Sequence, residues 1–254
     1  MFAEYKNEID YKEQNGYDHE GTWYPRVTKI VGIKAKPALY RYYGDAQSYA
    51  SAKASTERSA EEGTLVHEAV EALLLGKTPE VDSIILPAVN AFREFALKKN
   101  ISTEPEFVER RIVHGEHRYA GTIDALAFID GKFGVLDIKT SSGIYRDYNL
   151  QTSAYVEALL KDFPEINTRW ILRLDQIENC LRCGATRRVK GGNEKVKKPY
   201  GWGVCKIHEW GEVEGIAELK EFPDWKPDFE AFLGAKRLWE WENEPWLKKI
   251  GYLG

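Results

Sequence analysis

The sequence has few cysteines, a small net charge and no long apolar run. Its 254 residues include three cysteines, an odd number that argues against the paired disulfides of a small secreted protein. No apolar stretch approaches the roughly 20 residues that a helix needs to span a bilayer. The first residues lack the apolar region of a signal peptide and the Arg-rich, Ser-rich composition of a transit peptide. We therefore expect a cytoplasmic protein that does not bind membranes.

The charge balance limits the kind of nucleic-acid binding that the chain can perform. The formal net charge is −4, with 36 basic against 40 acidic residues, which argues against a surface that binds nucleic acid all over. A local basic groove is still compatible with this balance, because charges are screened within about 8 Å at physiological salt. Hydrophobic residues make up 43% of the chain and charged residues 30%, as in ordinary globular proteins.

The spacing of apolar residues is helical in the first hundred residues and alternates after Pro105. We expect a loosely ordered lead-in over 1–22, then a helix with Thr28 as its N-cap. Further helices are predicted over 37–60 with an interruption near Gly44, 61–75, 83–98, 149–161 and 226–243. Strands are predicted over 107–113, 119–129, 133–138, 169–176 and 202–210, the second and third joined by a tight turn at Asp130-Gly131.

This order of elements predicts an α/β fold with a central mixed, largely antiparallel sheet flanked by helices, and with an N-terminal helical region. A chain of this length can bury one sizeable core, so we expect a single domain over 1–254. Its expected parts are a mostly helical part at 1–100, a catalytic core at 105–176, a basic cysteine-containing insertion at 177–208 and a C-terminal helix at 226–246.

Two aspartates and a lysine are predicted to converge in the strand region. Side chains alternate along a strand, so Asp137 and Lys139 face the same side, and the Asp130-Gly131 turn brings Asp124 alongside. Two carboxylates beside one lysine are costly unless a cation lies between them. Mg²⁺ suits such a site, because it prefers oxygen ligands and retains water. We therefore predict Asp124, Asp137 and the Ile138 carbonyl as metal ligands. Lys139 would orient or activate the attacking water.

A simpler interpretation of these residues also exists. Asp137 and Lys139 would then be an exposed strand pair, and Asp124 would cap a turn; Asp-x-Lys is common by chance. The flanking residues favour the metal site, since Asp137 follows the apolar pair Val135-Leu136 and Asp124 lies in the apolar run 123–128.

The motifs taken in order resemble those of a known nuclease family. Gly121-Thr-Ile-Asp124, Asp137-Ile-Lys139 and Gln151-x-x-x-Tyr155 look like the motifs of the PD-(D/E)XK nuclease superfamily, in its RecB-like branch. That branch has a histidine on an upstream helix, and Gly63-Thr-Leu-Val-His67 fits that place. The similarity covers about residues 24–160.

Two shorter segments are similar to a narrower group within that branch. Val27-Thr-Lys-Ile30 and Thr140-Ser141 match the group of the mitochondrial genome maintenance exonuclease and related phage and bacterial enzymes. That similarity implies a protein encoded by a bacterium, or by a phage and made in the host cytoplasm.

The resemblance implies a restriction-endonuclease-like core and a metal-dependent DNA exonuclease. Such an enzyme hydrolyses phosphodiester bonds in single-stranded DNA or at DNA ends, during recombination, repair or replication. The resemblance further implies His67 as a ligand of Mg²⁺ or Mn²⁺, and Gln151 and Tyr155 as residues that position the site and the DNA backbone. Two alternatives stay open: a non-catalytic nucleic-acid-binding module on the same fold, and a zinc-stabilised interaction protein.

The accessory residues each have an ordinary structural explanation. His67 among apolar neighbours would more often be a hydrogen-bonded core histidine. Glu71 lies one turn later and would either steady His67 or face solvent. Gln151 and Tyr155, four residues apart, would otherwise form part of a plain helix surface. Glu109 is a candidate for supporting the site from outside the ligand set.

The later part of the chain holds a second candidate metal site. Cys180-Leu-Arg-Cys183 resembles a zinc knuckle, and Cys205 with His208 would complete a Cys₃His set. In a regular strand Cys205 and His208 would point to opposite faces, so the set requires a bulge or turn between them. The alternative is that the cysteines are reduced and bind no metal.

A basic stretch lies between the Cys180–Cys183 pair and the Cys205–His208 pair, and Tyr200 and Trp202 follow it. Basic and aromatic side chains together are typical of an arm that contacts phosphates and stacks on bases. A solvated hairpin is the alternative. The basic residues predicted to bind DNA are Arg187, Arg188, Lys190, Lys197 and Lys198, and the same stretch contains Arg182 and Lys195.

Overall fold

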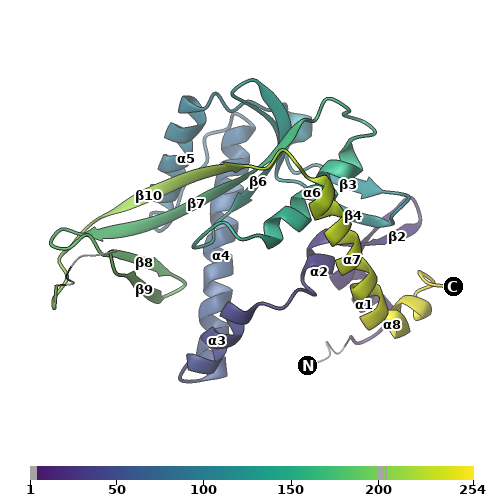
Figure 1. The fold of residues 1–254 in the computed structure, drawn as a ribbon, viewed down its shortest axis with the longest axis horizontal. Helices are drawn as coiled ribbons and strands as arrows, with labels where there is room; N and C mark the ends of the chain where they lie inside the picture. Colours follow the sequence, from purple (N-terminus) through teal and green to yellow (C-terminus); the bar gives the residue numbers. More distant parts are fainter. Residues whose placement is uncertain (1–4, 200–202, 204) are drawn as a thin grey trace.

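The computed structural model describes residues 5–199, 203 and 205–254, and Figure 1 shows their fold. The helices are α1 Glu8–Asn15, α2 Val27–Val31, α3 Pro37–Asp45, α4 Tyr49–Leu74, α5 Leu86–Lys98, the 3₁₀ turn η1 Pro105–Phe107, α6 Asp147–Leu159, α7 Lys226–Glu242 and α8 Glu244–Lys249. The strands are β1 Gly16–His19, β2 Thr22–Pro25, β3 Arg111–His114, β4 Tyr119–Thr122, β5 Ala125–Ile129, β6 Lys132–Lys139, β7 Thr168–Cys180, β8 Thr186–Lys190, β9 Asn193–Lys197 and β10 Trp210–Glu221.

The six-stranded sheet is built around the long strand β7. Strand β6 pairs with β7 in parallel over 168–173, and β8 pairs antiparallel with the end of β7 at Glu178 and Asn179. Strand β10 runs antiparallel to β7 from Trp170 to Cys180, and β5 is antiparallel to β6. The sheet is therefore mixed and largely antiparallel, as predicted. The parallel pair β6–β7 is connected by the crossing helix α6.

Helices cover both faces of this sheet, because its strands alternate apolar side chains between two clusters. One cluster packs Leu136, Ile138 and Leu172 against α4 and α5. The other packs Val135 with residues of α6 and α7, among them Phe232. Burying a side chain of this size contributes roughly 1.5 to 3 kcal/mol. The alternation also directs Asp137, next to Val135 and Leu136, toward the α6 side.

An extension of the sheet projects past α4 and α5 (Figure 1). We call residues 176–199 and 205–214, as far as they are described, the arm. It contains the outer half of β7, the β8–β9 hairpin and the start of β10. Because β7 and β10 continue from the core without a break, the arm is held by the sheet's own backbone hydrogen bonds.

Several sequence predictions of local structure are confirmed. The interruption between α3 and α4 falls at residues 46–48, close to Gly44. The helices predicted over 37–60 and 61–75 are joined, because α4 is continuous from Tyr49 to Leu74. The tight turn joins β5 to β6, with positive φ at both Asp130 (50°) and Gly131 (81°). That backbone geometry suits a two-residue hairpin. No helix in the described part of the chain is long and apolar enough to cross a bilayer.

Other predictions are wrong. Thr28 does not cap α2; Arg26 occupies the N-cap position without a side-chain hydrogen bond. Residues 5–22 of the expected lead-in are not loosely ordered, because they contain α1, β1 and the first residue of β2. Residues 107–110 do not form a strand, because Glu109 has a positive φ of 50° and η1 precedes it.

Three predicted elements have different boundaries. The strand expected over 119–129 is interrupted at Ile123 and Asp124, so Asp124 lies between β4 and β5 and belongs to neither strand. Residues 205–209 of the strand expected over 202–210 are irregular, and β10 begins only at Trp210. The helix expected over 226–246 ends at Glu242, and α8 follows. The predicted aromatic contacts of Tyr200 and Trp202 lie outside the described residues.

Candidate functional site

Asp124 lies in the gap between β4 and β5, beside the end of β6. The backbone N–H of Ile138 donates to Oδ2 of Asp124 at 2.5 Å. The other oxygen, Oδ1, is 3.7 Å from Nδ1 of His67 on α4. At this interruption of the strand, the Asp124 side chain faces His67 of α4.

Asp137 is the most deeply buried acid of the site, with 1% of its surface exposed. Its Oδ1 accepts a hydrogen bond from Nε2 of Gln151 at 3.2 Å. Its Oδ2 forms an ion pair with Nζ of Lys139 at 2.6 Å. Two carboxylates, those of Asp137 and Asp124, thus share one lysine, and a bound cation would offset the negative charge that remains.

Two residues of α6 hold this carboxylate in place. Nε2 of Gln151 also donates to the hydroxyl of Tyr155, one turn later, at 2.9 Å. Tyr155 is buried, and a Cβ atom added to Gly121 would lie 2.6 Å from its ring. Glycine at position 121 thus leaves room for the ring that supports Gln151.

The protonation equilibria of the site are strongly perturbed. Burial, with the nearby Asp124 carboxylate, raises the pKa of Asp137 to about 6 against the opposing effect of Lys139. Burial also disfavours the charged form of Asp124, but the contacts with His67 and Lys139 outweigh it and lower its pKa. The pKa of His67 is raised, because Asp124 stabilises the imidazolium more than burial destabilises it.

The accessory acids lie on the same side of the cleft as His67. Burial, followed by repulsion from Asp124 and Glu71, raises the pKa of Glu109 to about 7. Glu71 and Glu109 line an open cavity of 390 Å³ together with His67 and Thr140. Concentrated negative charge of this kind favours a cation.

A second open cavity, of 380 Å³, adjoins the first at His67 and Thr140. Its lining has a different character, because it contains Lys139, the hydroxyls of 140–142 and the aromatic rings of Tyr145 and Tyr148. Nζ of Lys139 lies 5.2 Å from the centre of the Tyr148 ring. The site therefore lies in a cleft with one acidic end and one basic and aromatic end.

Tyr148 is a site residue that the sequence motifs did not reveal. It lines the second cavity, and burial raises its pKa against the effect of a hydrogen bond with Ser141. Its spacing of three residues from Gln151 and seven from Tyr155 places it on the same helix face. That spacing was the available signal.

The predicted DNA-binding side chains occupy two different environments. Arg187 forms two hydrogen bonds with Glu178, at 2.6 and 2.7 Å, and Arg188 is paired with the buried Asp175. Lys197 and Lys198 are exposed. The first two charges are thus already balanced within the protein.

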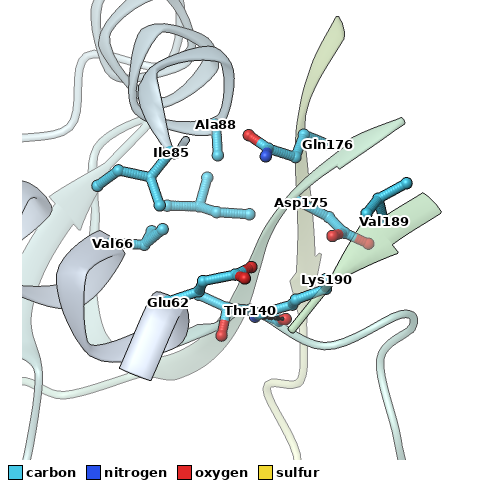
Figure 2. Close-up of a pocket in the computed structure, with 10 residues that line it drawn as sticks. Glu62, Val66, Ile85, Ala88, Thr140, Asp175, Gln176, Val189 and Lys190 are labelled. Carbon is cyan, nitrogen blue, oxygen red and sulfur yellow. Dashed lines mark hydrogen bonds between the residues drawn. The ribbon is translucent and has the colours of Figure 1, made fainter. Parts of the chain in front are cut away.

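Lys190 points inward, between the arm and α4, as Figure 2 shows. Its ammonium donates to the backbone oxygen of Thr140 at 2.5 Å. Burial, followed by repulsion from Arg188, lowers its pKa to about 8. A small cavity of 20 Å³, lined by Glu62, Asp175 and Gln176 among others, lies beside it, which is room for about one water molecule.

The structure brings Cys180, Cys183, Cys205 and His208 together at the arm. Their ligand atoms all lie within 4.8 Å of one another, so the set can hold a metal ion. The Sγ–Sγ distances are 3.7 Å for Cys180–Cys205 and 3.5 Å for Cys183–Cys205. Nδ1 of His208 is 3.6 Å from the sulfur of Cys183 and 3.2 Å from that of Cys205. The irregular segment 205–208 provides the turn that the sequence required.

The thiol pKa values of Cys180 and Cys183 are lowered, whereas burial and the nearby thiols raise the pKa of Cys205 to about 11. Burial opposes ionisation of Cys180, but backbone N–H groups, first that of Arg182, and the His208 side chain lower its pKa to about 5. Contact with Cys180 in turn raises the pKa of His208. Thiolates are the form of cysteine that binds metals.

No protein-family model matches the chain, and no curated protein matches it.

Proposed function

We propose that this protein is a metal-dependent DNA nuclease that hydrolyses phosphodiester bonds, acting as an exonuclease on single-stranded DNA or DNA ends. The observation that carries the proposal is the cluster of ionisable side chains at the cleft, in which the buried Asp137 pairs with Lys139 and Asp124 lies beside His67. Clusters of this kind with perturbed pKa values are found mainly where a protein binds a ligand or performs chemistry. Recombination, repair or replication is the setting that the motif resemblance implies.

The residues present fit Mg²⁺ or Mn²⁺. Asp124 and Asp137 would contribute carboxylate oxygens, Ile138 its carbonyl and His67 its imidazole, the kinds of donor that Mn²⁺ accepts together. When bound, the ion would polarise the phosphodiester and lower the pKa of a water molecule.

The chain's own residues would complete the chemistry. Burial lowers and the two aspartates raise the pKa of Lys139, with a net rise, so Lys139 is a cation at neutral pH. It would orient the attacking water and stabilise the charge that develops on the phosphate. Gln151 fixes the direction of the Asp137 carboxylate, and Tyr155 fixes Gln151. The site would therefore be organised before the substrate arrives.

The two ends of the cleft support a direction for the substrate strand. The end lined by Lys139, Tyr145 and Tyr148 suits a phosphate chain with stacked bases, whereas the end lined by Glu71 and Glu109 would repel phosphates. Lys197 and Lys198 on the exposed hairpin would add phosphate contacts. Single strands suit these rings, because their bases are free to stack.

The alternatives are separable from this proposal. A binding module on the same fold would bind DNA without cleaving it. A zinc-stabilised interaction protein would hold metal only at the cysteine cluster, for which Zn²⁺ is the ion that thiolate and imidazole donors favour.

The protein is first dialysed to remove Mg²⁺ and Mn²⁺. Cleavage of end-labelled single-stranded and double-stranded DNA is then measured with added Mg²⁺, with added Mn²⁺ or with neither. Asp137→Asn serves as the matched variant, because it keeps the shape of the side chain. Metal-dependent shortening that Asp137→Asn lacks would support the nuclease, and the position of the label would give its polarity. DNA binding without cleavage by either protein would instead support the binding module.

A further inference from the structure

The Cys₃His cluster lies where three segments of the arm meet. Cys180 ends β7, Cys183 lies in the turn toward β8, and Cys205 and His208 precede β10. A tetrahedral Zn²⁺, with Zn–S near 2.3 Å and Zn–N near 2.0 Å, would separate its ligand atoms by about 3.5 to 3.8 Å. Of the six separations, those of 3.5, 3.6 and 3.7 Å fall in this range and one is 3.2 Å, while the two between Cys180 and Cys183 or His208 lie within 4.8 Å.

The backbone around Cys180 and Cys183 forms a tight turn that presents both sulfurs to the same point. The N–H of Cys180 donates to Ala185 O at 2.7 Å, and the N–H of Gly184 donates to Cys180 O at 2.9 Å. Gly184 has a positive φ of 69°, which glycine adopts without strain. Backbone hydrogen bonds thus hold the segment that carries both sulfurs.

Disulfide formation does not account for the arrangement. All three cysteines are free, and their sulfurs are well beyond the roughly 2.05 Å of a disulfide bond. A disulfide would also use two of the three sulfurs and leave the third with His208. One ion would satisfy all four ligand atoms together.

We propose that these four residues bind one structural Zn²⁺, and that this ion holds the β8–β9 hairpin in place beside the candidate active site. The connection runs through stacked side chains. The ring of His208 stacks on Trp210, with centroids 4.7 Å apart, and the guanidinium of Arg187 on β8 lies 4.8 Å from the Trp210 ring centre. Fixing His208 therefore fixes the surface on which β8 packs.

The other end of the hairpin is anchored to α4. The N–H of Gly191 donates to Oε1 of Glu62 at 2.8 Å, and its carbonyl accepts from Oγ of Ser55 at 2.7 Å. A Cβ atom at Gly191 would collide with Ser59. Between the two anchors, Lys190 contacts the Thr140 oxygen next to Lys139. Loss of the ion would free one anchor and loosen the strand that bears Lys190.

Any effect of the ion on DNA cleavage rests on the proposed nuclease function. Zinc binding and the ordering of the hairpin do not. The first experiment therefore measures neither cleavage nor DNA. Bound metal is determined by mass spectrometry in the full chain, for wild type, Cys183→Ser and the control His19→Ala, which replaces an exposed histidine far from the cluster. Hydrogen exchange is then followed in residues 186–197 and, as an internal reference, in the β5–β6 hairpin.

We expect about one Zn²⁺ per chain in wild type and His19→Ala, and a small fraction of that in Cys183→Ser. We expect exchange in 186–197 to be faster by about tenfold or more in Cys183→Ser, with the β5–β6 hairpin unchanged. Wild type without stoichiometric zinc would overturn the metal site. Zinc in wild type with equal exchange in both proteins would overturn the role in positioning.

If the Cys183→Ser variant does not fold, a second measurement tests the metal site in wild type alone. Wild type is prepared with Co²⁺ in place of the native metal, and its absorption spectrum is recorded. Strong thiolate-to-cobalt charge transfer with intense visible bands is expected for a tetrahedral S₃N site. Spectra of octahedral, oxygen-ligated Co²⁺ alone would overturn the assignment. If the zinc experiments give the expected results but wild type does not cleave DNA, only the nuclease proposal is contradicted.

Discussion

Nε2 of Gln151 donates to Oδ1 of Asp137 and to the hydroxyl of Tyr155, so one amide links the buried acid to the buried phenol. Replacement Gln151→Ala removes this link while leaving Asp137 and Lys139 in place. We expect the cleavage rate to fall roughly 10-fold to 100-fold, the usual effect of a residue that orients a metal ligand. Single-turnover cleavage beside Gln14→Ala, an exposed glutamine of α1, measures it. Equal rates for both variants would exclude a role for Gln151 in positioning.

His67 tests the composition of the metal site. Because an imidazole nitrogen favours Mn²⁺ over Mg²⁺, His67→Ala should lose more activity with Mn²⁺ than with Mg²⁺. Rates are measured over a range of each metal's concentration, with His117→Ala as the control. An unchanged ratio of the two activities would show that His67 does not bind the ion.

Gly121 tests the packing that supports the site. The Cβ atom of Gly121→Ala would lie 2.6 Å from the Tyr155 ring, so we expect a loss of about 1 to 3 kcal/mol in the free energy of unfolding. Gly234→Ala on α7 is the matched control, because its Cβ meets no atom and alanine favours helix. Urea denaturation measures both variants. Equal stability of the two would mean that Tyr155 is loosely packed.

Lys197 and Lys198 test the DNA-contacting surface of the hairpin. Each lost phosphate contact should reduce the slope of log K against log salt by roughly 0.7 on single strands. The double variant Lys197→Gln, Lys198→Gln is compared with Arg187→Gln, using an Asp137→Asn background that prevents cleavage. Since Arg187 is already paired with Glu178, its variant should change the slope less. The reverse order would place the phosphate path along Arg187.

His114 tests the pH dependence of stability at a distance from the metal site. Its Nδ1 accepts from the N–H of His117, and burial, followed by the His117 charge, lowers its pKa against the effects of Glu116 and Glu157. A histidine with a lowered folded-state pKa costs stability as the pH falls through its unfolded value of about 6.5.

Replacement His114→Phe keeps a ring against Tyr119 and Phe229 but removes the titration. The comparison is made at about pH 7.5 and about pH 5.5, roughly one unit on either side of that unfolded pKa. We expect the free energy of unfolding to fall less in the variant than in wild type between these two pH values. Thermal melts at the two pH values measure the difference. Identical losses would mean that His114 titrates normally in the folded state.

Sequence periodicity predicted the mixed sheet and the long helices, because these depend on regular apolar spacing. The convergence of Asp124, Asp137 and Lys139 also followed from strand alternation and the Asp130-Gly131 turn. The break at Ile123–Asp124 had no such signal, since apolar residues continue through it and the backbone bonds there go to Glu109 and Arg110.

The surroundings of the basic residues were beyond prediction from sequence. Arg188 and Lys190 resemble free charges in the sequence, yet Asp175 and Thr140, distant in the chain, bind them. Such pairings are set by tertiary contacts, which local patterns do not encode. The Cys₃His spacing was informative because metal ligands must meet in space whatever lies between them.

Strand β7 passes from the core into the arm without interruption, and β10 accompanies it. Ile177 and Glu214 face each other across this pair at the point where the arm begins. The core strand order therefore does not depend on anything beyond this pair. The arm instead reaches the candidate site from outside the core, because Arg188 and Lys190 both donate to the carbonyl of Thr140.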